Sequence, residues 1–345
     1  MRLFIVGPKW VGEWTESMTR AAQSLGHSPI PFYYDTFGVQ RLQGGLLGRF
    51  PSQVREMLMP AALRFGQMWE AQANARLVAL AKQAAPDAII ILKGATLTSE
   101  TLTALKLLNV PLVSWWVDDP FRAPQAMRSF HLFDVVYMFD KGRLAEIEQA
   151  GARRIVYLPC ACDPDPFQPQ SLDPKVHPDL ACTIGFVAVY YPGRGALLGQ
   201  MQGLDVGLWG PGWDAADELK ALPANTWRGR RISATQAAKV YNLASICPNV
   251  HHPQTQIGGL NTRSFEVLAA GGFELVDNVA GLDENFEIGN EIVTYNSPAH
   301  FRELADYYLA HPDERKTIAQ RGRARVLRDH TYAQRLTTIL RTMST

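Results

Sequence analysis

Short β-rich runs alternate with amphipathic stretches along the whole chain, and this alternation restricts the fold more than any other feature. Runs such as Ala-Ile-Ile-Ile-Leu at 88–92 predict strands. The stretches between them carry apolar residues every three or four positions and predict helices. Repeated strand–helix–strand units favour parallel sheets, so the sequence predicts an α/β fold.

The predicted elements form two groups of similar size. The first group has strands at 2–6, 28–32, 88–92, 111–116, 135–139 and 155–158, with helices at 13–25, 51–83, 99–108 and 141–150. The second has strands at 181–187, 205–209, 245–249, 273–276 and 291–295, with helices at 192–201, 234–241, 262–270, 298–310, 312–326 and 333–343. Six prolines between residues 159 and 179 oppose regular structure. We therefore expect two Rossmann-like domains that face a cleft, at 1–165 and 180–328, with a linker at 166–179 and a final helix at 329–345.

Composition limits the classes of function. With 345 residues, 47% hydrophobic and 19% charged, the chain resembles ordinary soluble proteins with two domains. A net charge of +1 gives no global attraction for nucleic acid. No apolar run is long enough for a membrane span or a signal peptide, so we expect a cytoplasmic protein. The four cysteines, at 160, 162, 182 and 247, lack metal-site spacing and predict reduced thiols.

Residues 261–277 predict a capped helix that runs directly into a strand. Asn261 is the expected N-cap, and Gly271 or Gly272 the left-handed stop. Arg263 and Glu266 lie three positions apart, on a different face from the apolar residues. A cation at a helix N-terminus opposes the helix dipole, which makes Arg263 a candidate for binding an anion at this end.

Six segments of the second half occur in the order found in CgeB-like glycosyltransferases. They are 183–186 with Tyr190, Tyr191 and Arg194, then 208–213, 241–250, 261–266, 286–292, and 330–332 with Arg335. The first half matches chiefly through Trp-Trp-Val-Asp-Asp-Pro at 115–120. The chain thus resembles this family, which implies the GT-B fold, a first domain on the acceptor side, and a last helix that often crosses back over that domain. It also implies sugar transfer from a nucleotide-diphosphate sugar to a hydroxyl acceptor, with the sugar nucleotide as co-substrate and no other cofactor or metal.

The resemblance gives roles to several side chains. Arg194 and Arg263 would stabilise the leaving diphosphate as catalytic cations, as GT-B enzymes do without a metal. Glu266 resembles the glutamate that accepts from the ribose hydroxyls. The alternatives are a surface arginine for Arg194, an intrahelical Arg263–Glu266 pair, and a plain surface glutamate. Many retaining relatives carry a second glutamate eight positions earlier, where this chain has Gly258, so the sugar and the stereochemistry stay open.

Other candidates line the donor side with less specific signals. Backbone N–H groups of Gly258, Gly259 and Asn261 can face phosphate or sugar hydroxyls, although a plain loop is the alternative. Tyr190 and Trp209 are core or pocket-wall aromatics, with stacking on the base as the functional alternative. His251 has no spaced partners for a metal site and is assigned to donor-pocket lining or structure. Gly7 follows the first strand and is a weak candidate for contact with the phosphates.

Asp118 and Asp119 follow a predicted strand and precede Pro120. At a strand carboxyl end, one of them can act as general base or bind the acceptor. Neighbouring residues in a strand point to opposite sides, so only one can face the cleft, and a cap or turn role is the alternative for either.

Three classes of function therefore stay open. The first is a glycosyltransferase whose acceptor is a protein, a glycan, a lipid-linked intermediate or a small molecule; the near-neutral charge disfavours DNA as an acceptor. The second is a sugar-nucleotide epimerase or hydrolase of similar architecture. The third is a non-catalytic protein that binds a nucleotide sugar between two lobes.

Overall fold

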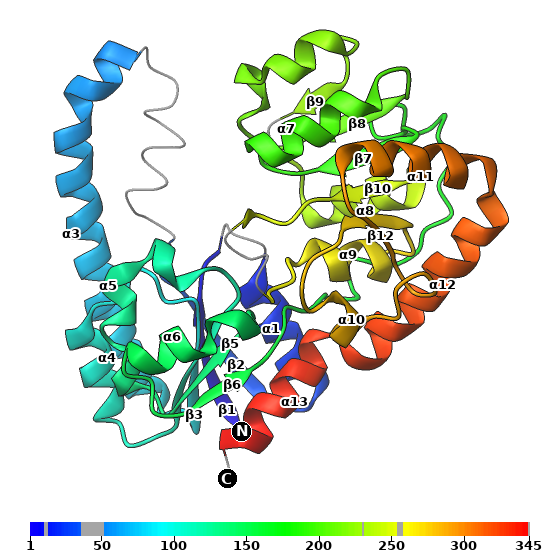
Figure 1. The fold of residues 1–345 in the computed structure, drawn as a ribbon. Coiled ribbons are helices and arrows are strands. Elements are labelled where there is room, and N and C mark those ends of the chain that lie inside the picture. The colour runs from blue at the N-terminus through cyan, green and yellow to red at the C-terminus, as the bar shows by residue number, and fades with distance from the viewer. Residues whose placement is uncertain (10–12, 36–51, 230, 254–257, 344–345) are drawn as a thin grey trace. The chain divides into compact units, whose positions relative to one another are not determined.

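A computed structural model describes residues 1–9, 13–35, 52–229, 231–253 and 258–343 (Figure 1). The contacts divide the chain into two compact units, Met1–Pro159 with Arg335–Thr345, and Cys160–Gln334. The predicted linker at 166–179 lies within the second unit, where Phe167 stacks on Tyr241 with 6.2 Å between the ring centroids.

The first unit is built on a six-stranded parallel sheet in the order β2-β1-β3-β4-β5-β6. Its strands are β1 (Arg2–Gly7), β2 (Ser28–Tyr33), β3 (Ala88–Leu92), β4 (Leu112–Trp116), β5 (Val135–Met138) and β6 (Ile155–Tyr157). Its helices are α1 (Trp14–Ser24), α3 (Ser52–Ala84), α4 (Ser99–Lys106), α5 (Pro124–Met127), α6 (Leu144–Gln149) and α13 (Tyr332–Met343), with 3₁₀ turns at Pro120–Arg122, Phe130–Leu132 and Lys141–Arg143. The long helix α3 packs beside α4 (Figure 1).

The apolar sequences of the central strands match their burial in this sheet. All residues of β3, β4 and β5 are buried, as expected for central parallel strands covered on both faces. The last helix also belongs to this packing, because Tyr137 donates a hydrogen bond to the carbonyl of Ile339 and Arg335 donates to that of Pro159.

The second unit contains two three-stranded parallel sheets, β7-β8-β9 and β10-β11-β12. A parallel bridge between Ile184 and Ile246 connects them through β7 and the start of β10. The strands are β7 (Ile184–Val187), β8 (Val206–Trp209), β9 (Trp227–Gly229), β10 (Cys247–Asn249), β11 (Glu274–Asp277) and β12 (Val293–Tyr295). The helices are α7 (Pro192–Leu198), α8 (Ala234–Leu243), α9 (Arg263–Ala269), α10 (Leu282–Asn285), α11 (Pro298–Ala310) and α12 (Pro312–Asp329), with 3₁₀ turns at Gly199–Met201, Trp213–Ala215 and Asp217–Ala221.

The predicted α/β class with two Rossmann-like halves is confirmed, and most element bounds differ from the predicted ones by one to three residues. The prediction missed β9, a three-residue edge strand whose sequence, Trp-Arg-Gly, has no clear strand pattern. It correctly carried α3 across Pro60, and the left-handed stop after α9 is Gly271, with φ of +83°.

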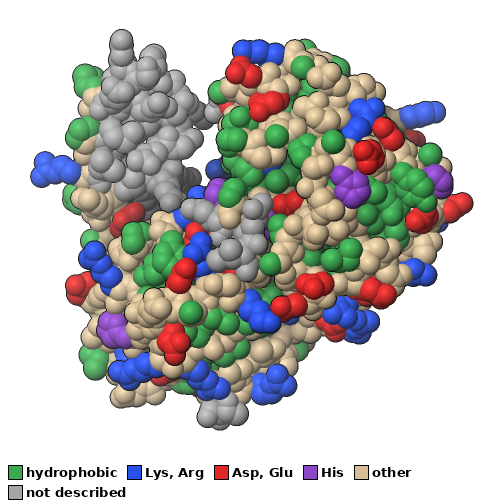
Figure 2. All heavy atoms as spheres, viewed as in Figure 1, with side chains coloured by type: hydrophobic (Ala, Val, Ile, Leu, Met, Phe, Trp, Pro, Cys, Tyr) green, Lys and Arg blue, Asp and Glu red, His purple; other side chains and the backbone are tan. Residues whose placement is uncertain are grey.

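The charge pattern on the surface fits the composition. Figure 2 shows basic and acidic side chains interspersed over the visible face of both units, as a net charge of +1 suggests. Across the described parts of the chain, no helix combines the length and apolar character that a membrane crossing requires.

Candidate functional site

The strand order of the second unit creates a topological switch point between β7 and β10. From β7 the chain moves outward to β8 and β9, and then returns to β10 on the other side of β7. Open α/β sheets bind ligands outside the strand carboxyl ends at such a point, because the flanking loops diverge there. The two predicted diphosphate-binding arginines, Arg194 and Arg263, both direct their guanidinium groups to this point.

Arg194 lies in the first turn of α7, as predicted, but its side chain is buried. It donates to the carbonyl of Val250 (3.0 Å) after β10 and to that of Val189 (2.9 Å) after β7, and it stacks on Tyr191 with 4.2 Å to the ring centroid. Burial, followed by the nearby charge of Arg263, lowers the pKa of Arg194 from 12.5 to about 9.

Arg263 reaches the same place from α9. It donates to the carbonyl of Val187 (2.8 Å) at the end of β7 and to the side-chain oxygen of Asn249 (2.9 Å) at the end of β10. Within the described residues, neither Arg263 nor Arg194 forms an ion pair with a carboxylate. Two buried or half-buried cations therefore converge on neutral oxygens, which is an arrangement that an anion would stabilise.

A buried amide network holds the Arg263 side of the site. Asn249 donates to Asn261, Ser264 and Glu274, and Asn261 donates back to Asn249 (2.9 Å). The predicted N-cap role of Asn261 is wrong: α9 begins one residue later, its N-cap is Thr262, and no side chain caps it. The amide of Asn261 bonds to Asn249 because that partner lies buried beside it at the end of β10.

Glu274 is a member of this network that the sequence analysis missed. Its side chain is 1% exposed, and its Oε1 accepts from Asn249 at 2.7 Å while Oε2 has no hydrogen-bond partner in the described part of the chain. Burial raises the pKa of Glu274 to about 8, against the opposing effect of the Asn249 hydrogen bond. The signal available in the sequence was a charged residue at the start of a short strand, Glu-Leu-Val-Asp, whose middle residues are apolar.

His251 forms a buried pair with Asp277. Its Nδ1 lies 2.8 Å from the Asp277 carboxylate, which also accepts from the His251 backbone N–H. The side chain of His251 is fully buried, and its Nε2 has no hydrogen-bond partner among the described residues. Nε2 is therefore the ring nitrogen with which a ligand near the switch point can form a hydrogen bond.

A pocket of about 440 Å³ opens at the carboxyl ends of β10, β11 and β12. Val250, Asp277 and Tyr295 line it, so it adjoins the carbonyl that holds Arg194 and the carboxylate that holds His251. Space for a ligand therefore adjoins Val250, the residue whose carbonyl holds Arg194.

Three other residues predicted to contact the nucleotide sugar have surroundings unlike those of the two arginines. Trp209 is 2% exposed in β8, with Arg228 over its ring, and so presents no free face to a base. Tyr190 packs edge-on against Trp213, with 5.1 Å between the ring centroids. Glu266 is half-buried on α9.

The glycines follow two patterns. Gly258 and Gly259 are buried, and Gly258 has φ of +149°, which an L side chain rarely adopts. Gly7 belongs to the first unit, where a Cβ atom would lie 2.3 Å from the Thr15 hydroxyl and 3.1 Å from Leu92. Close packing of α1 against the sheet is therefore sufficient reason for glycine at position 7.

Asp118 and Asp119 lie after β4 at the carboxyl edge of the first unit's sheet. Asp118 pairs with Lys93 (2.5 Å) and Arg122 (3.6 Å); burial alone would raise its pKa, but these cations outweigh burial and the pKa of Asp118 lies below its usual value. Asp119 is 3% exposed and caps the turn at Pro120–Arg122 by accepting from the Phe121 N–H.

Asp140, after the neighbouring strand β5, was not predicted as a site residue. Burial raises its pKa to about 6, although a hydrogen bond from Gly142 and the charge of Arg143 oppose the rise. A carboxyl group that titrates near neutral pH is suited to proton exchange. The sequence offered only an aspartate after a strand, which is a common cap position.

Comparisons with known proteins fit this geometry. Residues 194–341, which begin at Arg194, match the glycosyl transferase-like family. The spore protein CgeB of Bacillus subtilis is 25% identical over 252 residues, which cover 68% of this chain and 75% of that protein. The chain therefore resembles CgeB-like glycosyltransferases, and the part that matches the family model is its second half.

Solved structures with the same fold cover this chain almost completely. Anabaena HepE in complex with UDP-glucose shares 14% identity at a TM-score of 0.65, covering 100% of this chain and 99% of its own. Sucrose-phosphate synthase of Thermosynechococcus elongatus shares 13% identity at a TM-score of 0.63, covering 99% of both chains. The predicted GT-B fold is confirmed.

No set of three His, Cys, Asp or Glu side chains in the described part of the chain converges in a way that would hold a metal ion. The four cysteines are free thiols and buried. The guanidinium groups of Arg194 and Arg263 at the switch point carry the positive charge that suits an anionic group such as a diphosphate.

Proposed function

We propose that this protein transfers a sugar from a nucleoside-diphosphate sugar to a hydroxyl acceptor, and that its own cations, in place of a metal, stabilise the leaving diphosphate. One observation carries the proposal: Arg194 and Arg263 converge at the β7/β10 switch point without a carboxylate partner among the described residues. Their repulsion and desolvation oppose the folded state and are relieved when an anion binds.

In this reaction the bond between the anomeric carbon and the diphosphate oxygen breaks, and a bond from the acceptor oxygen to that carbon forms. Negative charge grows on the diphosphate as the bond breaks, so guanidinium groups fixed beforehand stabilise the transition state more than the ground state. The backbone carbonyls that hold Arg194 and the amide of Asn249 that holds Arg263 supply this preorganisation.

The remaining donor roles follow from position. Glu266, one turn along α9 from Arg263, is proposed to accept from the ribose hydroxyls. Gly258, Gly259 and Asn261 are proposed to line the sugar and phosphates. The Nε2 of His251, which has no partner among the described residues, is proposed to form a hydrogen bond with a hydroxyl of the nucleotide sugar.

On the acceptor side, Asp118 is proposed to orient the acceptor hydroxyl. Its ion pair with Lys93 keeps it charged, and a carboxylate with a low pKa binds a hydroxyl well but removes its proton poorly. Asp140, with a pKa of about 6, is better matched to take up that proton. Asp119 is proposed to act through the turn that it caps, since its carboxylate already accepts from the Phe121 N–H.

The first test is a thermal-shift series with UDP, GDP, TDP and CMP. A ligand that binds only the folded state raises the melting temperature by mass action. We expect UDP to give the largest rise, because HepE, which shares the fold, was solved with UDP-glucose. No rise with any nucleotide at millimolar concentration would contradict the proposal.

Consumption of a sugar nucleotide is the second readout. Release of the nucleoside diphosphate that depends on an added hydroxyl acceptor supports transfer. Conversion of the donor without an acceptor would instead support the epimerase or hydrolase alternative, and binding without any conversion would support a non-catalytic role.

A further inference from the structure

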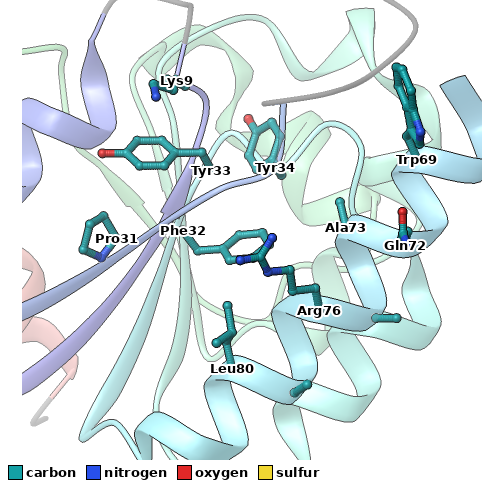
Figure 3. Close-up of a pocket in the computed structure, with 12 residues that line it drawn as sticks. Lys9, Pro31, Phe32, Tyr33, Tyr34, Trp69, Gln72, Ala73, Arg76 and Leu80 are labelled. Carbon is teal, nitrogen blue, oxygen red and sulfur yellow. The ribbon is translucent and has the colours of Figure 1, made fainter.

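The first unit contains a pocket of about 900 Å³ between β2 and α3 (Figure 3). Phe32, Tyr33 and Tyr34 come from the carboxyl end of β2 and the residue after it, and Trp69 comes from α3. Lys9, after β1, and Arg76, on α3, also line the pocket, and Figure 3 shows Arg76 extending from the helix on the side of Phe32. The pocket thus combines four aromatic rings with two cations.

The described lining carries positive charge. Among the described lining residues are the exposed side chains of Lys9 and Arg76 and no carboxylate, although the Asp35 carboxylate lies nearby and accepts from the backbone N–H of Lys9 at 2.6 Å. In the described part of the chain Arg76 forms no ion pair. Lys9 lies over the ring of Tyr33 at 5.5 Å from the centroid, so its charge is held at the mouth of the pocket. A ligand that suits this lining has an apolar ring and an anionic group.

The edge strand itself does not suit a peptide. β2 is the edge of its sheet, and the N–H groups of Ser28 and Tyr34 bond to β1 through the carbonyls of Met1 and Gly7. Alternate residues therefore face the free edge, and two of these, Pro29 and Pro31, have no N–H to donate. An added strand would find few backbone donors, which leaves a small molecule as the fitting occupant.

We propose that this pocket binds the acceptor, and that the acceptor is a small molecule with a ring and an anionic group. This inference rests on the proposed function, since it names the substrate that receives the sugar. The aromatic side chains pack against the ring, while Arg76 and Lys9 attract the anionic group. The carboxyl end of the sheet is also where open α/β sheets bind ligands.

The test uses two matched probes, 4-nitrophenyl β-glucuronide and 4-nitrophenyl β-glucoside, which differ in a carboxylate at one position of the sugar. Binding to the full chain is measured by calorimetry. We expect the glucuronide to bind about threefold more tightly, the size typical of an exposed ion pair. Arg76→Gln should remove this preference, and Trp69→Ala should weaken the binding of both probes by about three- to tenfold.

Two neighbours on α3 provide controls. Arg64 and Phe65 are exposed on the same helix but do not line the pocket. Arg64→Gln and Phe65→Ala should leave both affinities unchanged. Equal affinity of the two probes for the wild type, absence of probe binding, or an equal loss in the control variants would overturn the pocket assignment.

UDP binding separates the two hypotheses. All four variants should bind UDP as the wild type does, because the substituted residues lie in the first unit and the cations of the donor site in the second. If the wild type binds UDP but the affinity for the probes is the same in the Arg76 and Trp69 variants, the acceptor pocket alone is refuted. A protein that binds the probes selectively but no nucleotide supports the pocket's chemistry and refutes the transferase.

Discussion

Replacing Arg263 by glutamine should abolish most of the stabilisation that UDP gives, without much change in the unliganded protein. Arg263→Gln removes one of two neighbouring positive charges and two hydrogen bonds, to Val187 and Asn249. The lowered pKa of Arg194, about 9 instead of 12.5, means that keeping its charge costs about 5 kcal/mol relative to water, and part of this cost comes from Arg263. Loss of repulsion and loss of hydrogen bonds then oppose each other, so we expect a change in unfolding free energy within about 1 kcal/mol.

The liganded protein should respond differently. A charge-assisted hydrogen bond to a phosphate contributes about 1.5–3 kcal/mol, so loss of Arg263 should weaken UDP binding about 10- to 150-fold. At a UDP concentration of about 100 times the wild-type Kd, the wild type gains about 2.7 kcal/mol. A variant with about 100-fold weaker binding gains only about 0.4 kcal/mol at the same concentration.

Differential scanning fluorimetry with and without UDP measures this difference. About 2–4 °C per kcal/mol is typical of a unit of this size, so the variant should lose about 5–9 °C of the UDP-induced shift. Arg228→Gln is the matched control, because Arg228 also donates to a backbone carbonyl, that of Ala181 at 2.7 Å, but lies over Trp209 outside the site. If Arg263→Gln keeps the full UDP-induced rise in melting temperature, or if Arg228→Gln loses as much of that rise, the reasoning is refuted.

Two further substitutions test the buried Glu274 and the half-buried Asp118. The pKa of Glu274 is about 8 in the folded protein and near 4.5 in the unfolded chain, so between these pH values only the folded state keeps the proton on Glu274. The free energy of unfolding should therefore fall by about 1.4 kcal/mol per pH unit as the pH rises from 4.5 to 8. Glu274→Gln should remove this contribution in urea titrations at pH 5, 6.5 and 8, and identical slopes in both proteins would contradict it. Asp118→Asn should raise the acceptor KM about tenfold or more and leave UDP affinity unchanged, since it removes a charged acceptor paired with Lys93. Asp134→Asn, which breaks the comparable ion pair with Lys106, is the control, and a similar KM effect there would count against Asp118.

The fold was predictable because its signals are local. The apolar run at 88–92 can be stable only where both faces are covered, and this identifies a central strand without any tertiary information. Gly271 ends α9 because only glycine adopts the left-handed conformation there without strain. β9 was missed because three residues at a sheet edge carry too short a pattern.

The site was only partly predictable. Arg194 and Arg263 were named from their places at the starts of helices, and the structure brings both to one switch point. The role of Asn261 was wrong because a cap is a local inference, whereas its amide is bonded to Asn249, twelve positions earlier, across the fold. Glu274 and Asp140 escaped notice because burial, which gives each its raised pKa, is not a property of the residue type.

The sequence by itself therefore determined the alternation of strands and helices, the division into two Rossmann-like halves and the resemblance to CgeB-like proteins. These depend on residue order and on patterns that repeat every two or three to four positions. Only the tertiary structure decided which polar groups meet. Two arginines 69 positions apart became a single cationic site, because parallel strands place the loops that follow β7 and β10 side by side and exclude the water that would otherwise screen their charges.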